Sequence, residues 1–167
     1  ALCILSAINI GKIRDVSDLK SLCDLSVRSL DELIDFQGYP VEAAEIATKA
    51  RRSLGIGYIG LAHYLAKQGV KYGDPKAWEL VHDLTEAFQY HLIESTVNLA
   101  KEKGACEYSD RTKYAQGILP IDTYKKDVDE LVPNNLKYDW ETLRALVKEH
   151  GVRNSTLSAQ MPSESSS

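Results

Sequence analysis

The sequence predicts an α/β fold in which a mostly helical middle lies between two short strands, one near each end of the chain. Apolar residues recur at helical spacing over much of residues 15–150. Two short segments, CILSAINI near the start and VRNSTLSAQ near the end, indicate the strands. With 167 residues, 44% of them hydrophobic, the chain can bury one core. We therefore expect residues 1–167 to form a single partial domain, a slice of a larger α/β protein.

The first predicted helix covers residues 15–36, where apolar side chains line one face and Asp and Lys line the other. Asp15 is the candidate N-cap, and Gly38 ends the helix. Pro40 suits the first position of another short helix. The apolar face consists of Leu19, Leu22, Cys23, Ser26, Val27, Leu30, Leu33 and Ile34.

The segment RRSLGIGYIGLAHYLAKQG, residues 51–69, is predicted to form a helix that is buried on most sides. It contains GIGYIG, which matches the glycine pattern of dinucleotide-binding proteins. That reading requires a strand directly before the motif, but the charged stretch ATKARRSL stands there. Dinucleotide-binding proteins also place an acidic residue at a strand end about 20 residues after the glycines. Here that residue would be Glu79, which lies inside a predicted helix. We therefore interpret the glycines as small residues that let this helix pack closely. Its apolar stripe consists of Leu54, Ile56, Tyr58, Ile59, Leu61, Ala62 and Leu65.

The second half of the chain opens with the longest predicted helix, residues 75–103, which closes at Gly104. Residues 105–138 are expected to form short helical pieces between turns. A last helix follows Asp139, its N-cap, and ends before Gly151. The long helix carries Trp78, Val81, Thr85, Phe88, Leu92, Ser95 and Leu99 in register.

Composition argues against several classes of function. The net charge of −4 and the pI near 5.6 do not favour a surface that neutralises nucleic-acid phosphates. No apolar stretch approaches the roughly 18 to 20 residues of a membrane span. The four histidines have no metal-ligand spacing, so we expect no metal site. The three cysteines form no CxxC pair, which favours a reducing, cytoplasmic setting.

Spacing alone says little about individual chemistry. Cys23 lies on an apolar helix face and is expected in the core, and Cys106 follows a helix end and is expected to be half exposed. Cys3 lies in a short apolar strand, and by spacing a structural role is favoured for it. The ending MPSESSS fits either a flexible tail or a helix N-terminus that holds an anion.

Six blocks of the sequence, taken together, resemble the catalytic large subunit of class I ribonucleotide reductase in its bacterial and tailed-phage form. The blocks are ALCILSAINIG, RRSLGIGYIGLAHYLAKQGV, EKGAC, YAQGILPIDTYKKD, YDWETLR and HGVRNSTLSAQMPSESSS. The resemblance runs from the first residue to the last. It implies a mostly helical slice of a ten-stranded α/β barrel, with barrel strands near both ends. It also implies the reduction of ribonucleoside diphosphates to deoxyribonucleoside diphosphates.

The resemblance assigns roles to individual residues. Cys3 matches the family's redox cysteine, one of a pair that supplies two electrons and becomes a disulfide, which thioredoxin or glutaredoxin resets. Leu5 and Met161 match residues that line the nucleoside pocket. Ser165 stands where some relatives have Thr and keeps the hydroxyl. The loop that binds the substrate diphosphate corresponds to Pro162, Ser163, Glu164, Ser165 and Ser166.

The resemblance also implies what this chain lacks. The partner cysteine, the Asn-x-Cys-x-Glu radical motif and the ATP and dNTP effector sites would lie upstream, in a large subunit that forms a homodimer. The metal-based radical would come from a small subunit. We expect the chain to bind no cofactor itself and to be inactive alone. The rival hypothesis is a helical protein-interaction module with a flexible Ser-rich tail.

Overall fold

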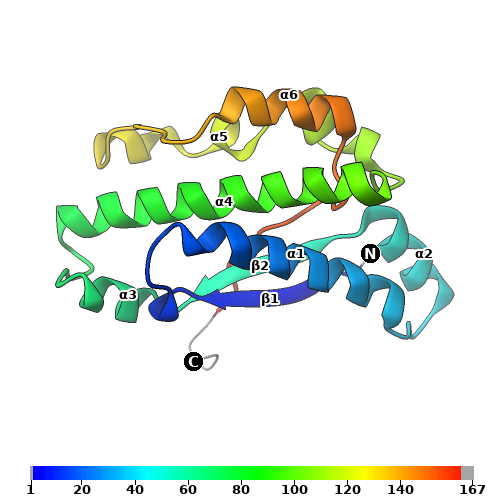
Figure 1. Cartoon of the computed structure of the whole chain (residues 1–167), viewed down its shortest axis with the longest axis horizontal. Helices are drawn as coiled ribbons and strands as arrows, with labels where there is room; N and C mark the ends of the chain where they lie inside the picture. The colour runs from blue at the N-terminus through cyan, green and yellow to red at the C-terminus, as the bar shows by residue number, and fades with distance from the viewer. Residues whose placement is uncertain (1, 163–167) are drawn as a thin grey trace.

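A computed structural model describes residues 2–162 of the chain (Figure 1). The sequence-predicted site residues Ser163, Glu164, Ser165 and Ser166 lie outside the described residues. The strands are β1 (Ile4–Asn9) and β2 (Leu54–Ile59). The α-helices are α1 (Asp18–Phe36), α2 (Glu42–Arg51), α3 (Leu61–Lys67), α4 (Pro75–Lys103), α5 (Pro120–Thr123) and α6 (Trp140–His150). The short 3-10 helices are η1 (Ile10–Lys12), η2 (Ser109–Arg111), η3 (Tyr114–Gln116) and η4 (Lys126–Glu130).

The sheet is parallel, and a third extended segment continues it. β1 pairs with β2 in a register that runs from Ile4 opposite Leu54 to Asn9 opposite Ile59. On the other edge of β2, residues 156–159 run parallel to it: the Ile56 amide donates to the Leu157 carbonyl over 2.8 Å. The Ala159 amide donates back to the Ile56 carbonyl over 3.1 Å. The strand expected near the end of the chain is thus an extended segment joined to β2 by a single bridge.

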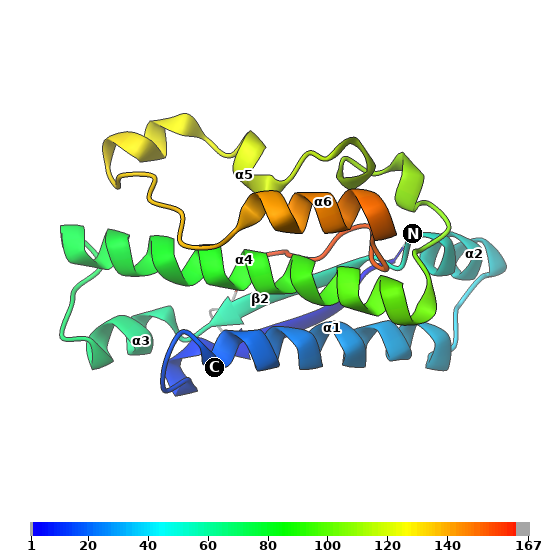
Figure 2. The same cartoon turned by 45° about the horizontal axis from the view of Figure 1, so that its top comes forward.

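The helices are stacked on one face of this sheet. α1 packs on both strands and along α4, and the Tyr58 ring of β2 meets Phe88 of α4 edge to face at 5.5 Å. α6 packs on the opposite side of α4. Figures 1 and 2 show α4 running through the middle, between α6 on one side and the sheet with α1 on the other. The core between these layers includes Ile8, Leu19, Cys23, Val27, Leu54, Ile56, Leu84, Leu92, Ile93, Leu143 and Val147.

The prediction of one helix over residues 51–69 is wrong. Residues 54–59 form β2, and α3 begins only after Gly60, which turns the chain at φ 79°. Residues 54–57 are all buried, and the large side chains of Leu54 and Ile56 alternate with Gly55 and Gly57, which is the period of a strand. Because these glycines lie within the strand and not in a turn that follows it, the motif lacks the geometry of a dinucleotide fingerprint.

The predicted helix boundaries are confirmed for α4 and wrong for the starts of α1 and α2. The helix over 75–103 is confirmed at both ends, and Asp139 caps α6 by accepting the Thr142 amide over 2.9 Å. Asp15 is not an N-cap: its carboxylate accepts the Ser17 amide, and α1 starts at Asp18. The second helix starts at Glu42, two residues after Pro40.

The cysteine predictions also divide. Cys23 is buried, as expected. Cys106 is only 5% exposed and not half exposed, because its amide donates to the Val152 carbonyl over 3.0 Å and draws the loop inward.

Candidate active site

One face of the sheet is left open by the helices. α1 and α4 lie over one face of the sheet (Figures 1 and 2). Ile8 and Ile56 are buried on that face, and strand alternation points the neighbouring residues of both strands the other way. On this second face Leu5 stands opposite Gly55, and Ala7 stands opposite Gly57. Leu5 is 61% exposed, although it is a large apolar residue within a strand. We call this surface the open face.

Gly55 provides the space in which Leu5 lies. A Cβ atom at Gly55 would stand 2.6 Å from Leu5 Cδ2 and 3.3 Å from Ala159 Cβ. Non-bonded carbon atoms prefer about 3.5–4.0 Å, so the leucine occupies space that any side chain at this position would need. Leu5 therefore lies flat across β2 because residue 55 is glycine.

Gly57 does the same for the segment that follows the third strand. A Cβ atom there would lie 2.7 Å from the Ala159 carbonyl oxygen and 3.0 Å from both Sδ and Cε of Met161. Gln160 holds this crossing in place: its Oε1 accepts the Tyr58 amide over 3.2 Å, and its Nε2 donates to the Tyr58 carbonyl over 2.7 Å. The side chain of Gln160 thus takes over the pairing with β2, which lets the backbone turn and places Met161 over Gly57.

Cys3 stands at the edge of the open face. It directly precedes β1, its thiol is free and exposed, and strand alternation puts it on the same side as Leu5. Two residues of extended chain separate their Cα atoms by about 7 Å. The structure therefore brings together three of the sequence-predicted site residues, Cys3, Leu5 and Met161, with exposed Pro162 next in the chain.

The other two cysteines have a different environment. Burial raises the pKa of the Cys23 thiol to about 12 and also raises the pKa of Cys106. Because the thiolate is the reactive form, neither is a nucleophile at neutral pH. Among residues 2–162, no three His, Cys, Asp or Glu side chains gather as a set that could hold a metal ion. Within the same residues, no helix combines the length and apolar character needed to cross a membrane.

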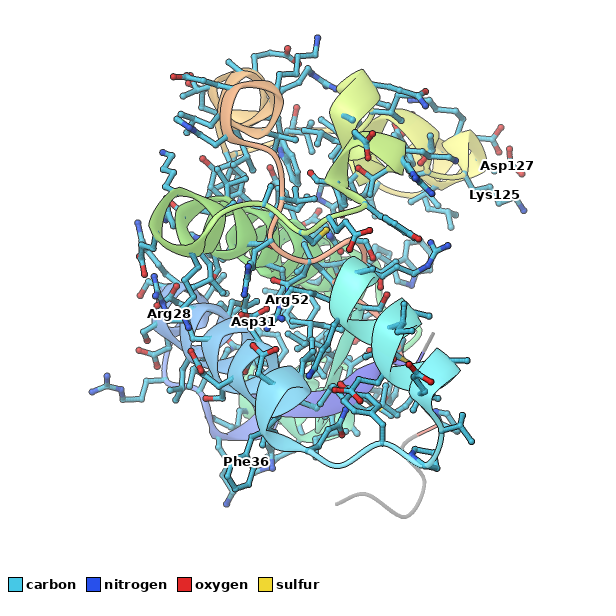
Figure 3. The ribbon with its side chains drawn as sticks, turned by 90° about the vertical axis from the view of Figure 1, so that its right-hand side faces the viewer. Arg28, Asp31, Phe36, Arg52, Lys125 and Asp127 are labelled. Atoms are coloured by element: carbon cyan, nitrogen blue, oxygen red, sulfur yellow. The ribbon has the colours of Figure 1, made fainter. Side chains whose placement is uncertain are left out.

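A buried ionic network fixes the strands at the end from which they start. Asp31 of α1 and Arg52, which ends α2 in the left-handed conformation at φ 49°, are 1% and 5% exposed. Arg52 Nε donates to Asp31 Oδ1 over 2.7 Å, and both Nη atoms donate to the Asp35 carboxylate. Figure 3 shows Asp31 and Arg52 together inside the fold, whereas Lys125 and Asp127 lie at its periphery. This pair joins α1 to the residues that lead into β2.

Asn154 connects the third segment to the same network. Its Nδ2 donates to Asp31 Oδ1 over 2.9 Å and to the Arg52 carbonyl over 3.1 Å, and its Oδ1 accepts the Thr96 hydroxyl over 2.8 Å. Arg153 Nε donates to the second oxygen of Asp31 over 3.1 Å. One carboxylate therefore holds α1, the start of β2 and the segment leading to residues 156–159 through charge-assisted hydrogen bonds.

The network also sets the charge state of its members. Burial acts to lower the pKa of Arg52, but hydrogen bonds to Asp35 and Asp31 outweigh this and raise it above its usual range. The same guanidinium holds the pKa of Asp35 below its ordinary value of 3.8. The Arg52–Asp35 pair is therefore ionic at neutral pH.

Three residues that shape the open face were not predicted from the sequence as site residues. Gly55 and Gly57 were visible as a period-two alternation with Leu54 and Ile56, which is a strand signal. Gln160 gave no signal, because its pairing with Tyr58 joins residues 102 positions apart.

These features define a segment of an α/β protein whose open sheet face presents a thiol beside a shallow apolar surface. The sequence model of the family "Ribonucleotide reductase, barrel domain" matches residues 1–167, so the chain belongs to that family.

Relatives in bacteria and a phage agree with this assignment. The chain is 60% identical over its whole length to the ribonucleoside-diphosphate reductase subunit alpha of Haemophilus influenzae, and it covers 22% of that protein. It is 55% identical over 134 residues, 80% of the chain, to ribonucleoside-diphosphate reductase 1 subunit alpha of Escherichia coli, of which the match covers 18%. Over 99% of the chain it is 46% identical to the subunit alpha of phage T4, again covering 22%. The chain thus spans about a fifth of the length of these relatives.

Proposed function

We propose that residues 1–167 are part of the catalytic barrel domain of a ribonucleoside-diphosphate reductase subunit alpha, and that the open face is one wall of its nucleotide site. The observation that carries the proposal is the gathering of Cys3, Leu5 and Met161 on one uncovered sheet face. In this proposal the three parallel segments belong to a ten-stranded barrel, whose interior the open face lines. A parallel sheet is normally covered on both faces, which supports further elements on this side.

The proposed chemistry uses Cys3 as a reductant. Cys3 and a second cysteine, from outside this chain, supply two electrons and two protons to a ribonucleoside diphosphate. The C2′–O bond breaks, the oxygen leaves as water, a C2′–H bond forms, and the two thiols become a disulfide. A dithiol suits this step because an external thioredoxin or glutaredoxin resets it by thiol–disulfide exchange. The exposure of Cys3 supports this role, since both the substrate and the partner thiol must reach it.

The remaining parts of the site are proposed by position. Leu5 and Met161 would contact the nucleoside, with Pro162, Ser163, Glu164, Ser165 and Ser166 holding the diphosphate through amides and hydroxyls. The described part of this loop, Met161 and Pro162, directly follows the Gln160 contact with β2 and so starts at a fixed point.

The proposed partners follow from the relatives. They are each named subunit alpha, which implies another kind of subunit, and we assign to it the metal-based radical that starts the reaction. An alpha homodimer regulated by ATP and dNTP effectors, in the reducing cytoplasm, completes the proposal. The rival hypothesis of a helical interaction module with a flexible tail is not favoured, because the whole chain matches an enzyme domain.

The test compares Cys3→Ser with wild type in the full-length protein, supplied with its small subunit, ATP, CDP and a dithiol reductant. We expect Cys3→Ser to abolish turnover and to leave CDP binding intact. Cys106→Ser is the matched control, since this thiol is buried and is expected to leave turnover unchanged. Wild-type turnover by Cys3→Ser would refute the proposed role of the thiol.

A further inference from the structure

We infer that Gly55 and Gly57 are positioning residues that set the depth of the nucleoside site. This inference rests on the proposed function and concerns two residues that touch no substrate themselves. Each glycine lies beneath one of the two side chains proposed to contact the nucleoside: Leu5 lies against Gly55, and Met161 lies against Gly57. The missing Cβ atoms let both side chains lie low, and this leaves the space above them for the ligand.

The distances show how much depth is at stake. A methyl group at residue 55 would meet Leu5 Cδ2 at 2.6 Å, whereas carbon atoms prefer about 3.5–4.0 Å. The end of the Leu5 side chain would have to move by about 1 Å. It cannot move toward the other face of the sheet, because helices pack there. Because Leu5 is 61% exposed, it is free to move outward, into the proposed ligand space. The displaced leucine would then occupy space that the nucleoside needs, which weakens binding of the nucleoside.

The two glycines differ in what a methyl group would strike. At residue 55 the nearest atom is the end of a flexible side chain, which can rotate away. At residue 57 it is the Ala159 carbonyl oxygen, at 2.7 Å, which belongs to the backbone paired with Ile56. Gly55→Ala therefore displaces mainly the Leu5 side chain, whereas Gly57→Ala displaces the segment that leads into the proposed phosphate loop.

This difference gives the test its design. In the full-length protein, Gly55→Ala is expected to weaken CDP binding at least about tenfold, the effect of a misplaced methyl group in an apolar pocket. Because this is a loss of ground-state binding, KM rises and kcat at saturation stays close to wild type. In a Leu5→Ala background, which removes the nearest clashing atom, Gly55→Ala should weaken CDP binding much less, because only the 3.3 Å contact with Ala159 Cβ remains. Gly57→Ala should weaken binding as well, and Met161→Ala should not relieve it, because the backbone clash remains.

Gly73→Ala is the matched control. A Cβ atom at Gly73 has nothing within 4 Å, and its φ lies outside the left-handed region, so binding should be unchanged. If Gly55→Ala lowers the midpoint of thermal unfolding, CDP binding is compared between Leu5→Ala and Leu5→Ala/Gly55→Ala. In this pair the added methyl group meets no leucine, so the comparison shows whether Leu5 causes the loss of binding.

Two results would overturn the inference: CDP binding by Gly55→Ala equal to that of Gly73→Ala, or an equal loss from Gly55→Ala with and without Leu5. Failure of the proposed function is distinguishable from these two results. In that case the wild-type protein would not bind CDP, or Cys3→Ser would still reduce it.

Discussion

The isosteric change Asp31→Asn tests whether the buried network holds the sheet together. It removes one charge and turns one acceptor into a donor, opposite the donors of Arg52, Arg153 and Asn154. Breaking a buried ion pair by removing one partner costs about 3–5 kcal/mol. Arg52 keeps its hydrogen bonds to Asp35, so we expect the lower end, about 3 kcal/mol. That corresponds to a change of roughly 100-fold in the local opening equilibrium.

Hydrogen exchange of the full-length protein, followed by mass spectrometry, measures this opening where it occurs. The amides of residues 153–155 and of Leu54 and Ile56 are bonded across the segments that the network joins, and they should exchange about 100-fold faster. Amides of α6 serve as an internal reference. Asp127→Asn is the matched control, because Asp127 is 73% exposed and, within residues 2–162, pairs only with Lys125 at 3.2 Å. Equal exchange in Asp31→Asn and Asp127→Asn would refute the reasoning.

Two further predictions concern titrating groups. Under native conditions N-ethylmaleimide should modify Cys3 and spare Cys23 and Cys106, because burial raises the pKa of both of these thiols. CDP should slow the modification of Cys3. Mass spectrometry identifies the modified cysteines, and prompt labelling of Cys23 would contradict the argument. The hydrogen bond from Arg52 lowers the pKa of Asp35 in the folded state. The contribution of Asp35 to the stability of the fold is therefore complete above its unfolded pKa near 3.8, and it is lost as the pH falls through the lower folded pKa. Melting temperatures of wild type and Asp35→Asn should therefore differ by a constant amount from pH 7 to about 5 and converge below about 3.8; a gap that persists in acid would exclude this linkage.

Local rules predicted the long helices well. α4 starts at Pro75 and is followed by Gly104, and α6 is capped by Asp139, so residues within one turn of each end determine the boundary. Such signals are present in the sequence itself. They also explain why the short helices between residues 105 and 138 could be anticipated from their turn residues.

The local signals for β2 conflict, because the alternation of Leu54 and Ile56 with glycines favours a strand while other features favour a helix. Leu54, Tyr58, Leu61 and Leu65 have helical spacing, and the segment contains two glycines, which have low strand propensity. Its strand state comes from pairing with β1 on one side and residues 156–159 on the other, a tertiary effect that local propensity does not contain.

Some residues of the candidate site could be predicted from the sequence, and others required the structure. Cys3, Leu5 and Met161 were available from family resemblance, and the structure shows which of them share a face. The glycines beneath them required knowledge of the strand, and Gln160 required knowledge of its distant partner. The loop residues Ser163, Glu164, Ser165 and Ser166 stay predictions.

The contact between Gln160 and Tyr58 also has a consequence for the order of folding. It closes a loop of 102 positions, and such closure carries an entropy cost that no local interaction offsets. Packing of the helices between the two residues shortens this loop and so lowers the entropy cost of joining the third segment to β2. During synthesis from the N-terminus, β1 and β2 can pair early, but Met161 is made only after the helices that follow β2. Among residues 2–162, the face that we assign to catalysis is therefore completed after β1, β2 and the helices between them.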